Sequence, residues 1–434
     1  MDITDHLRRF LQSHPPAGRY VVAYSGGLDS HVLLHALSRL GIELAAVHVH
    51  HGLSRNADLW AEHCQAQCAA LGVPCRVVQV EVARDAGKGI EAAARSTRYA
   101  ALEQVLGEGE MLLTAHHQDD QAETLLLMLL RGAGVAGLAA MPAVRACGRG
   151  RLARPLLGLP RSALHLYAQR HGLSWVDDES NFDTSLDRNY LRHELLPLLR
   201  ERWPAAPRAL ARSAAHLAEA GELLAELAAA DLVTACGGRP GTLSVSALQP
   251  LTPPRRRNLL RHWLRTLDLP LPGTVHLHRI EQEVLLARRD AEPLVGWPGA
   301  EVRRYRDDLH AMPPLAPVPD AELEWDMAQP LPLPDGRTLT ATVVAAAPGL
   351  SAARCADARV TVRFRAGGER CAPVGRGHTH ELKKLFQEAR VPPWERERIP
   401  LLFVDGVLAQ VVGYWICVPY AAEEKEAAWR VQSG

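Results

Sequence analysis

The first third of the chain alternates short apolar runs with longer segments in which apolar residues recur three and four positions apart. The apolar runs predict β-strands at 20–24, 42–49, 75–82 and 110–115. The other segments predict helices at 29–40, 57–71, 90–106 and 118–131. Apolar strands separated by amphipathic helices are typical of an open parallel sheet that carries helices on both faces. We therefore expect an α/β fold in this part of the chain.

A glycine-rich segment links the first predicted strand to the first predicted helix. It reads Ser25-Gly26-Gly27-Leu28-Asp29-Ser30. Glycines allow a tight turn in which backbone N–H groups approach an anion, and the following helix directs its positive N-terminal end at the same place. The two serine hydroxyls can donate to phosphate oxygens. Because the carboxylate of Asp29 would repel a phosphate unless a cation lay between them, we expect Mg²⁺ at this loop.

The loop lacks the lysine of the ordinary NTPase motif. Its spacing resembles instead the pyrophosphate loop of ATP pyrophosphatases, which cleave ATP between the α- and β-phosphates. This resemblance implies that ATP is a substrate. A plain Gly-Gly turn with solvated polar residues is the alternative, and it explains less of the pattern because all six positions match after a strand.

Polar segments also follow two further predicted strands. They are His48-Val49-His50-His51-Gly52-Leu53-Ser54 and Thr114-Ala115-His116-His117-Gln118-Asp119-Asp120-Gln121. Ligands bind to open α/β sheets at the carboxyl ends of the strands, where the strand order reverses. We therefore expect the three polar segments to form one site.

Within the third segment, His116 and Asp120 lie four positions apart, so both can face one ligand. We expect Asp120 to hold Mg²⁺ together with Asp29, and His116 to contact the triphosphate or the reacting base. Asp119 is also explained as a simple helix cap, since carboxylates are favoured at helix N-termini. In the second segment, a core histidine with satisfied hydrogen bonds explains at least one of the three imidazoles.

The composition of the chain limits the number of domains and the kinds of partner that we expect. The chain has 434 residues, of which 47% are hydrophobic, and this length allows two or three domains with their own cores. The net charge of +0 provides no global basic field, so a polyanion must be held by local patches. The acidic first residues lack an apolar signal core, and no run of about twenty apolar residues predicts a membrane span. We expect no membrane association.

The 8 cysteines are scattered and none forms a C-x-x-C pair. A disulfide framework is implausible in a chain of this size, and the pattern is typical of a reducing cytoplasm. Cys64 and Cys68 are spaced for one helix face, but no second Cys or His pair has zinc-finger spacing. We expect these two thiols to be buried rather than to bind a metal.

Beyond residue 200 the pattern changes. Prolines and a tryptophan at 203–207 end the α/β region, and 208–236 and 251–289 predict helices. Pro-rich stretches at 312–319 and 330–334 are typical of linkers. Short β-like runs at 360–364 and 401–404 flank a basic helix around Lys383 and Lys384. The sequence therefore predicts an α/β catalytic domain at 1–210, a mainly helical domain at 211–345 and a small α+β domain at 346–434.

Further segments narrow the resemblance to the family of bacterial tRNA(Ile)-lysidine synthetases. They are Ser25–Ser30, His48–Ser54, Glu91–Tyr99, Thr114–Met141, Arg154–Leu157, Trp175–Asn181, Arg188–Arg192, Leu382–Gln387 and Val391–Arg396. The resemblance runs from about residue 20 to 434 and is weakest over roughly 205–345. The Thr114–Met141 segment and the two C-terminal segments are the most specific parts.

This resemblance implies a ligase that forms a carbon–nitrogen bond. ATP adenylates the C2 oxygen of the wobble cytidine in a tRNA(Ile) with the anticodon CAU, and pyrophosphate leaves. The ε-amine of free L-lysine then displaces AMP and forms lysidine, so that the tRNA reads AUA and is charged with isoleucine rather than methionine. The implied cofactors are ATP and Mg²⁺, the implied location is the cytoplasm, and some members are dimers.

The resemblance also assigns roles to single residues. The loop residues Ser25, Gly26, Gly27, Leu28, Asp29 and Ser30 are expected to bind ATP, and Asp29, His116 and Asp120 to take part in catalysis, with Asp29 and Asp120 on the metal. Arg95, Arg98, Arg188 and Arg192 are candidates for ATP, tRNA or lysine contacts, and Lys383 and Lys384 for the tRNA acceptor end. An exposed charged helix face is the alternative for Arg95 and Arg98. A carboxylate or histidine is needed to deprotonate the lysine amine, and the sequence does not identify it.

Five arginines at 255, 256, 257, 261 and 265 predict a basic stripe on one helix of the second region. Such a stripe fits a grip on a tRNA backbone, and a solvated amphipathic face explains it equally well. Aromatic residues make up only 5% of the chain, so we expect shape and phosphate contacts to dominate recognition.

Three other classes of protein share parts of this pattern. Enzymes that thiolate tRNA share the pyrophosphate loop, but those that act on cytidine carry C-x-x-C pairs for an iron–sulfur cluster, and this chain has none. A glutamine-dependent synthetase needs an N-terminal Cys nucleophile or a glutaminase domain, whereas Met1-Asp2 opens this chain. A non-catalytic tRNA-binding protein would be expected to have lost Asp29 or His116, and both are present.

Overall fold

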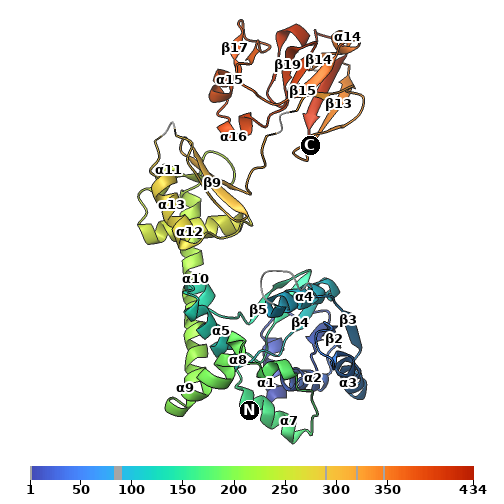
Figure 1. Ribbon diagram of the computed structural model, residues 1–434, viewed down its shortest axis with the longest axis vertical. Coiled ribbons are helices and arrows are strands. Elements are labelled where there is room, and N and C mark those ends of the chain that lie inside the picture. The colour runs from blue at the N-terminus through green and yellow to red at the C-terminus, as the bar shows by residue number, and fades with distance from the viewer. Residues whose placement is uncertain (1, 83–89, 289–290, 319–320, 346–347) are drawn as a thin grey trace. The chain divides into compact units, whose positions relative to one another are not determined.

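The computed structural model describes residues 2–82, 90–288, 291–318, 321–345 and 348–434 (Figure 1). The chain divides into two compact units, Met1–Glu226 and Leu227–Gly434.

The first unit is built on a six-stranded sheet with the order β3-β2-β1-β4-β6-β5 (Figure 1). Its strands are β1 (Tyr20–Ala23), β2 (Leu44–His50), β3 (Cys75–Gln79), β4 (Met111–Leu113), β5 (Val144–Cys147) and β6 (Gly150–Ala153). All neighbouring strands pair in parallel except β5, which pairs with β6 antiparallel. The four strands expected from the sequence, and their parallel arrangement, are confirmed.

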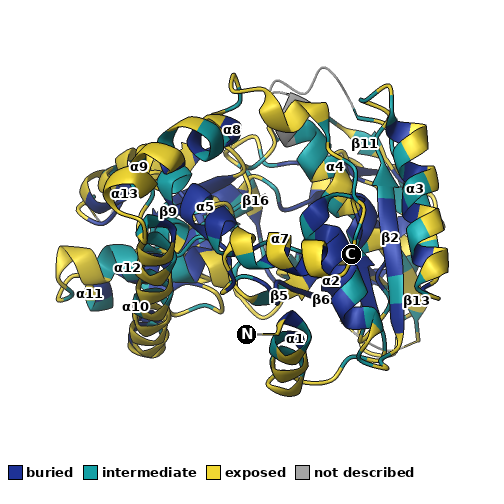
Figure 2. Cartoon of the chain, turned by 90° about the horizontal axis from the view of Figure 1, so that it is seen from below, coloured by how far each residue is buried: buried dark blue, intermediate teal, exposed yellow. Residues whose placement is uncertain are grey.

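Helices cover both faces of this sheet. They are α1 (Ile3–Gln12), α2 (Leu28–Ser38), α3 (Ala57–Ala70), α4 (Ile90–Val105) and α7 (Arg161–Arg170). The helices α5 (Gln118–Leu130) and α6 (Val135–Leu138) follow β4 and pack against each other. Alternate strand residues face opposite sides, so Val22 packs into the core beneath α1, α2 and α7, while Val21 packs into the core beneath α4. Figure 2 shows α2 in the dark blue of buried residues, whereas α3 has an exposed face. Burial on both faces explains why the strands are apolar throughout.

A helical segment completes the first unit. It contains a 3₁₀ turn at Glu179–Phe182, α8 (Asp187–Tyr190), a π-helical turn at Leu191–Leu195, α9 (Leu196–Arg202) and the first part of α10 (Ala206–Thr234), which continues into the second unit. The π-helical turn changes the rotation of the chain between α8 and α9, so it alters which side chains share a face.

The second unit begins with helices packed on a small sheet. The helices are α11 (Val245–Leu248), α12 (Pro253–Thr266) and α13 (Thr274–Arg279), followed by a π-helical turn at Ile280–Val284. The antiparallel sheet has the order β7-β10-β9-β8, from β7 (Leu243–Ser244), β8 (Leu294–Trp297), β9 (Ala300–Tyr305) and β10 (Asp308–Met312). The helices expected in this region are confirmed, and the sheet beside them is an element that the sequence reading missed.

The rest of the second unit is rich in short strands. They are β11 (Leu323–Glu324), β12 (Leu331–Pro332), β13 (Thr338–Val344), β14 (Leu350–Ser351), β15 (Val360–Arg363), β16 (Arg370–Cys371), β17 (His380–Glu381), β18 (Leu401–Val404), β19 (Val407–Val411), β20 (Trp415–Ile416) and β21 (Ala428–Ser433). The helices are α14 (Ala352–Cys355), α15 (Leu382–Glu388) and α16 (Pro393–Arg396), with a 3₁₀ turn at Val418–Tyr420. The two expected β runs pair as β15 and β18, and the expected basic helix is α15.

Two cysteines in this part differ from expectation, because Cys371 and Cys417 form a disulfide across a sequence separation of 46 residues. Both are buried in the core that packs against α15. The expected burial of Cys64 and Cys68 is confirmed, since both thiols are fully buried. Among the helices that the structure describes, none is long and apolar enough to cross a bilayer.

We expect six reactive thiols when the protein is unfolded without reductant, and eight after reduction, because six cysteines are free and two are paired. Titration with a thiol reagent in denaturant measures both numbers. The variant Cys371→Ser should give the same count before and after reduction. Eight thiols in the unreduced wild-type protein would contradict the pairing.

Candidate active site

The glycine-rich loop turns sharply between β1 and α2. Gly26 has a φ of +84°, and a Cβ atom built on it would lie 2.9 Å from Cys64 Sγ and 3.0 Å from Val176 Cγ2. The backbone N–H of Val176 donates to the Gly26 carbonyl oxygen at 3.1 Å. Both the positive φ and the close packing require glycine here. The turn therefore holds the N-terminus of α2 open to an anion.

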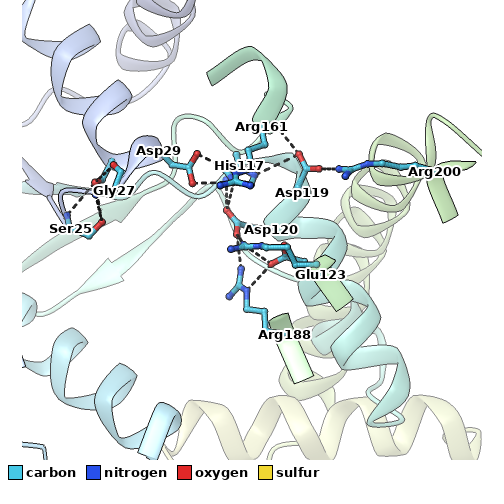
Figure 3. Close-up of polar contacts among 12 residues, drawn as sticks. Ser25, Gly27, Asp29, His117, Asp119, Asp120, Glu123, Arg161, Arg188 and Arg200 are labelled. Carbon is cyan, nitrogen blue, oxygen red and sulfur yellow. Dashed lines mark hydrogen bonds and ion pairs between the residues drawn. The ribbon is translucent and has the colours of Figure 1, made fainter. Parts of the chain in front are cut away.

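Two serine hydroxyls close this loop (Figure 3). Ser30 Oγ donates to the Gly27 carbonyl oxygen at 2.9 Å and accepts a hydrogen bond from the Ser25 backbone N–H at 3.2 Å. The hydroxyl oxygens of Ser25 and Ser30 lie 3.1 Å apart. The glycine backbone and the serine hydroxyls thus present a preformed cradle that fits phosphate oxygens.

The loops that follow β1 and β4 open at the same edge of the sheet. These strands are neighbours, and the strand order reverses between them, which is the position where α/β sheets bind ligands. A cavity of about 330 Å³ lies at this edge. Of the residues predicted from the sequence, it is lined by Ser25, Gly27, Asp29, Ser30, Arg95, Arg98, His116, Asp120 and Arg192, together with the three histidines of the second segment.

The other predicted residues lie elsewhere. Gly26 is inside the turn, and Leu28 lines a neighbouring cavity of about 640 Å³ that is bounded by α7 and α9. Arg188 reaches the first cavity only through its contact with Asp120. Lys383 and Lys384 are exposed on α15 in the second unit. The expected convergence of the three strand-end segments is therefore present in the geometry, whereas the roles of the single residues stay predictions.

His117 connects the loop to the third segment, and sequence reasoning gave it no role. Its imidazole is almost completely buried, and its Nε2 lies 3.5 Å from Asp29 Oδ2 and 3.4 Å from Asp120 Oδ2 (Figure 3). The His117 backbone N–H also donates to Asp120 Oδ2 at 2.9 Å, which caps α5. Its position just before the helix was the available signal. His117 thus holds the two predicted metal carboxylates near each other.

Asp120 and the buried Glu123 form a charge cluster with two arginines of the helical segment (Figure 3). Asp120 Oδ1 accepts from Arg188 at 2.8 Å and from Arg192 at 3.0 Å. Glu123 accepts from Arg188 Nε at 2.8 Å and from Arg192 Nε at 2.7 Å. Two carboxylates and two guanidinium groups balance, so each buried charge has partners. Glu123 is a second residue that sequence reasoning missed.

The charges around Asp120 determine the protonation state of its carboxyl group. Burial alone would raise the pKa of Asp120, but the neighbouring His117, Arg188 and Arg192 outweigh it and hold that pKa well below its usual range. In addition, both carboxylate oxygens of Asp120 accept hydrogen bonds within the protein. Asp29 differs, because its Oδ1 is buried without a hydrogen-bond partner among the described residues, and Arg161 Nε lies 3.9 Å from it. Of the two predicted metal carboxylates, Asp29 is therefore the one with an oxygen that accepts no hydrogen bond from the described residues.

His116 is neutral at physiological pH. Its Nδ1 lies 2.9 Å from Thr114 Oγ1, and burial lowers its pKa to about 3, although the carboxylate of Asp120 opposes this shift. A neutral imidazole offers one donor and one acceptor, not a positive charge. His116 is therefore suited to hydrogen bonding with a base or phosphate rather than to charge neutralisation.

The remaining polar residues of the strand ends have structural partners. His48 is buried and its Nδ1 lies 2.9 Å from the Tyr24 carbonyl oxygen, which confirms the expected core histidine. His50 contacts Asp58 at 2.9 Å. Asp119 accepts a hydrogen bond from the Arg161 backbone N–H at 2.9 Å and pairs with Arg200, so it caps α7 rather than entering the first cavity.

The predicted basic surfaces are partly neutralised by internal pairs. On α12, Arg255 donates to Asp231 at 2.7 Å and Arg257 to Glu281 at 3.0 Å. Near the cavity, the Arg95 guanidinium lies 5.1 Å from the centre of the Tyr99 ring. These contacts hold the arginines in place and reduce the net field that they would offer to a polyanion.

Comparisons with known proteins agree with this geometry. A family model described as a PP-loop domain matches residues 2–199, and this domain implies the use of ATP. Models described as the TilS substrate binding domain and the TilS substrate C-terminal domain match residues 243–310 and 360–433. The U34-tRNA thiolase NcsA from Methanococcus maripaludis has a TM-score of 0.41 and 16% identity, covering 50% of this chain and 78% of that one.

Curated relatives match over nearly the whole chain. The tRNA(Ile)-lysidine synthase of Alkalilimnicola ehrlichii is 50% identical over 402 residues, which cover 91% of this chain and 89% of that protein. The tRNA(Ile)-lysidine synthase of Coxiella burnetii is 43% identical over 434 residues, covering 99% and 96%. These matches, with both substrate domains, favour this assignment over tRNA thiolation. With its phosphate loop, its matched domains and this degree of identity, the chain belongs to the tRNA(Ile)-lysidine synthase family.

Proposed function

We propose that the chain ligates free L-lysine to C2 of the wobble cytidine in a tRNA(Ile) with the anticodon CAU. The observation that carries this proposal is the cavity of about 330 Å³, where the phosphate loop meets a balanced cluster of carboxylates and arginines. Residues 1–210 are the catalytic part of this proposal, 211–345 contribute tRNA contacts, and 346–434 bind the tRNA acceptor end.

In the first step, the C2 oxygen of the cytidine attacks the α-phosphorus of ATP, and the bond to the β-phosphate breaks, releasing pyrophosphate. The loop backbone and the Ser25 and Ser30 hydroxyls hold the leaving pyrophosphate, and the N-terminus of α2 stabilises its charge. Asp29 fits a Mg²⁺ ion because its Oδ1 lacks a partner at this place. Mg²⁺ neutralises phosphate charge when it is bound there.

In the second step, the ε-amine of lysine attacks C2, AMP leaves with the C2 oxygen, and the amine loses a proton. The arginine–carboxylate cluster offers charges of both signs, which match the carboxylate and the ammonium groups of free lysine. Arg188 and Arg192 are the proposed partners of the lysine carboxylate. Asp120 and Glu123 are the proposed partners of its α-ammonium group. His116 stays neutral and hydrogen-bonds the cytosine ring or the phosphate being transferred.

Incorporation of radiolabelled lysine into a CAU-anticodon tRNA(Ile) transcript, with ATP and Mg²⁺, tests the proposal. Label on tRNA(Ile) but not on tRNA(Met), with AMP and pyrophosphate released, is the expected result. ATP cleavage to AMP without lysine incorporation would overturn it and restore the thiolation alternative. Sedimentation of the same preparation tests the homodimer that the family resemblance implies, and fractionation of cells tests the cytoplasmic location.

The exposed lysines of α15 give a separate prediction. Lys383→Glu with Lys384→Glu should weaken tRNA binding and lower the slope of log Kd against log salt by about two, because two phosphate contacts are lost. Filter binding across a salt series measures this slope. ATP affinity should not change. A fall in ATP affinity with intact tRNA binding would show that this helix does not contact tRNA.

A further inference from the structure

The segment 391–396 is one of the most family-specific parts of the chain, and the proposed chemistry gives it no task. Its first residue, Val391, is fully buried in the core that packs against α15. Arg396 Nε donates to the Val391 carbonyl oxygen at 2.8 Å, which closes the segment into a compact turn around α16. The segment is therefore fixed to the part of the second unit that carries Lys383 and Lys384.

Trp394 points away from that core. It is only 7% exposed, yet it belongs to neither of the two hydrophobic clusters of the strand-rich part. Its partners come from the earlier sheet of the same unit: the His310 ring lies at 5.2 Å, the Tyr305 ring at 6.4 Å, and the Arg303 guanidinium at 5.4 Å from the indole. Trp394 is thus buried by β9 and β10, so its burial depends on the contact between these two parts.

Hydrogen bonds surround this tryptophan. Arg239 donates to the two Glu395 carboxylate oxygens at 2.9 and 3.1 Å and to the Arg390 carbonyl oxygen at 3.0 Å. Arg396 donates to the Tyr305 hydroxyl at 3.0 Å. The guanidinium groups of Arg239 and Arg396 each donate to oxygen atoms of two residues, and such an arrangement fixes direction as well as distance.

One further bond reaches α15 itself. Arg306, which follows β9, donates to the Gln387 carbonyl oxygen at 2.9 Å, in the last turn of the helix that carries the two lysines. The covalent connection between the two parts is a Pro-rich stretch at 312–318 without helix or strand beyond Met312. The stretch also contacts the strand-rich part, because Arg398 donates to the Ala316 carbonyl oxygen and Val318 packs against the core of that part. Parts joined by a stretch of this kind move unless their contacts hold them.

We propose that Trp394, Glu395 and Arg396 form a latch on β9 and β10 that fixes the position of Lys383 and Lys384. The three residues are positioning residues: they touch neither ATP nor the reacting cytidine, and they act through α15. This inference rests on the proposed function for its tRNA readout, but the latch itself is a physical contact that can be measured without it. It predicts that the latch raises affinity for a full-length tRNA by reducing the freedom that binding must remove.

The first test measures the latch without tRNA. Trp394→Ala should let the two parts move, so that limited proteolysis cleaves the already exposed 312–318 stretch faster than in the wild-type protein, while Trp394→Phe keeps the rate close to that of the wild type. Arg354→Glu is the matched control, because Arg354 pairs with Glu423 inside the strand-rich part and should leave cleavage unchanged. Equal cleavage of Trp394→Ala and wild type, with both folded by circular dichroism, would overturn the latch.

The second test uses a charge swap. Arg239→Glu and Glu395→Arg alone should each raise the KM for full-length tRNA by about tenfold with little change in kcat, since only the position of α15 is lost. The double variant should recover most of this loss. An equal fall of kcat in all variants, or no recovery in the double variant, would overturn the positioning role. Failure of the wild-type protein to modify tRNA would overturn the proposed function alone, because proteolysis still reports the latch.

Discussion

Asp29→Ala is expected to lower lysine incorporation by about 10³-fold or more, because the loop loses the carboxylate that we propose to hold Mg²⁺. The loop backbone should persist, since its turn rests on Gly26 and the serine hydroxyls. Binding of tRNA should therefore stay within a few-fold of wild type. The measurement is turnover with labelled lysine beside tRNA affinity by filter binding.

Asp58→Ala is the matched control for this variant. Asp58 also lies in the first turn of a helix, α3, and its partner is His50, so its removal changes the same kind of helix end. We expect a small effect on turnover. Full activity of Asp29→Ala, or an equal loss in both variants, would remove the proposed metal role. Raising the Mg²⁺ concentration should partly rescue Asp29→Asn but not Asp29→Ala, because the amide oxygen remains a weak ligand.

The parts of the site that are local in sequence could be predicted. A strand, two glycines, an aspartate and a helix are contiguous, so the positive φ of Gly26 follows from short-range sterics, whereas its close packing on Cys64 and Val176 does not. The position of the polar residues after β4 could also be predicted, because the carboxyl ends of parallel strands lie at one edge of the sheet. Spacing alone also indicated that His116 and Asp120 lie near each other, and both line the cavity of about 330 Å³.

The parts that depend on distant contacts could not be predicted in this way. Glu123 is an unremarkable helix residue until Arg188 and Arg192, more than sixty positions later, fold against it. The basic stripe on α12 looked available for tRNA, because the pairing of Arg255 with Asp231 is invisible in the spacing. The Cys371–Cys417 pair is a similar case. A cluster of charged residues in a sequence predicts an electrostatic field at the surface only when the residues that pair with them in the fold are known.

The π-helical turn at Leu191–Leu195 is another feature that local periodicity hides. Spacing alone places Arg188 and Arg192 one helical turn apart and leaves open whether they face tRNA or lysine. In the structure both side chains reach the same two carboxylates from α8 and the turn that follows it. Their charge is therefore committed to the cluster, and a ligand must compete with these pairs or join them.

Glu123→Gln should cost about 3 kcal/mol of the free energy of unfolding and abolish lysine incorporation. The carboxylate is fully buried, and without its charge the two guanidinium groups of Arg188 and Arg192 share the single carboxylate of Asp120. Chemical denaturation measures the first effect and labelled lysine the second. Because the pKa of Asp120 is depressed in the folded state, its ion pairs stabilise the protein above the ordinary carboxyl range and are lost as the pH falls. The variant keeps Asp120 and both guanidinium groups, so this acid-induced loss of stability should persist in it.

Two comparisons separate stability from chemistry in this variant. Glu301→Gln removes a similarly buried carboxylate that pairs with Arg303 at 2.8 Å in the second unit, so it should lower stability while keeping more of the activity. The double variant Glu123→Leu with Arg192→Met replaces a buried ion pair by apolar groups, which restores stability when packing is good. It should nevertheless stay inactive, since the charges proposed for lysine are gone. Recovery of turnover together with stability would show that the cluster is a structural support and that lysine binds elsewhere.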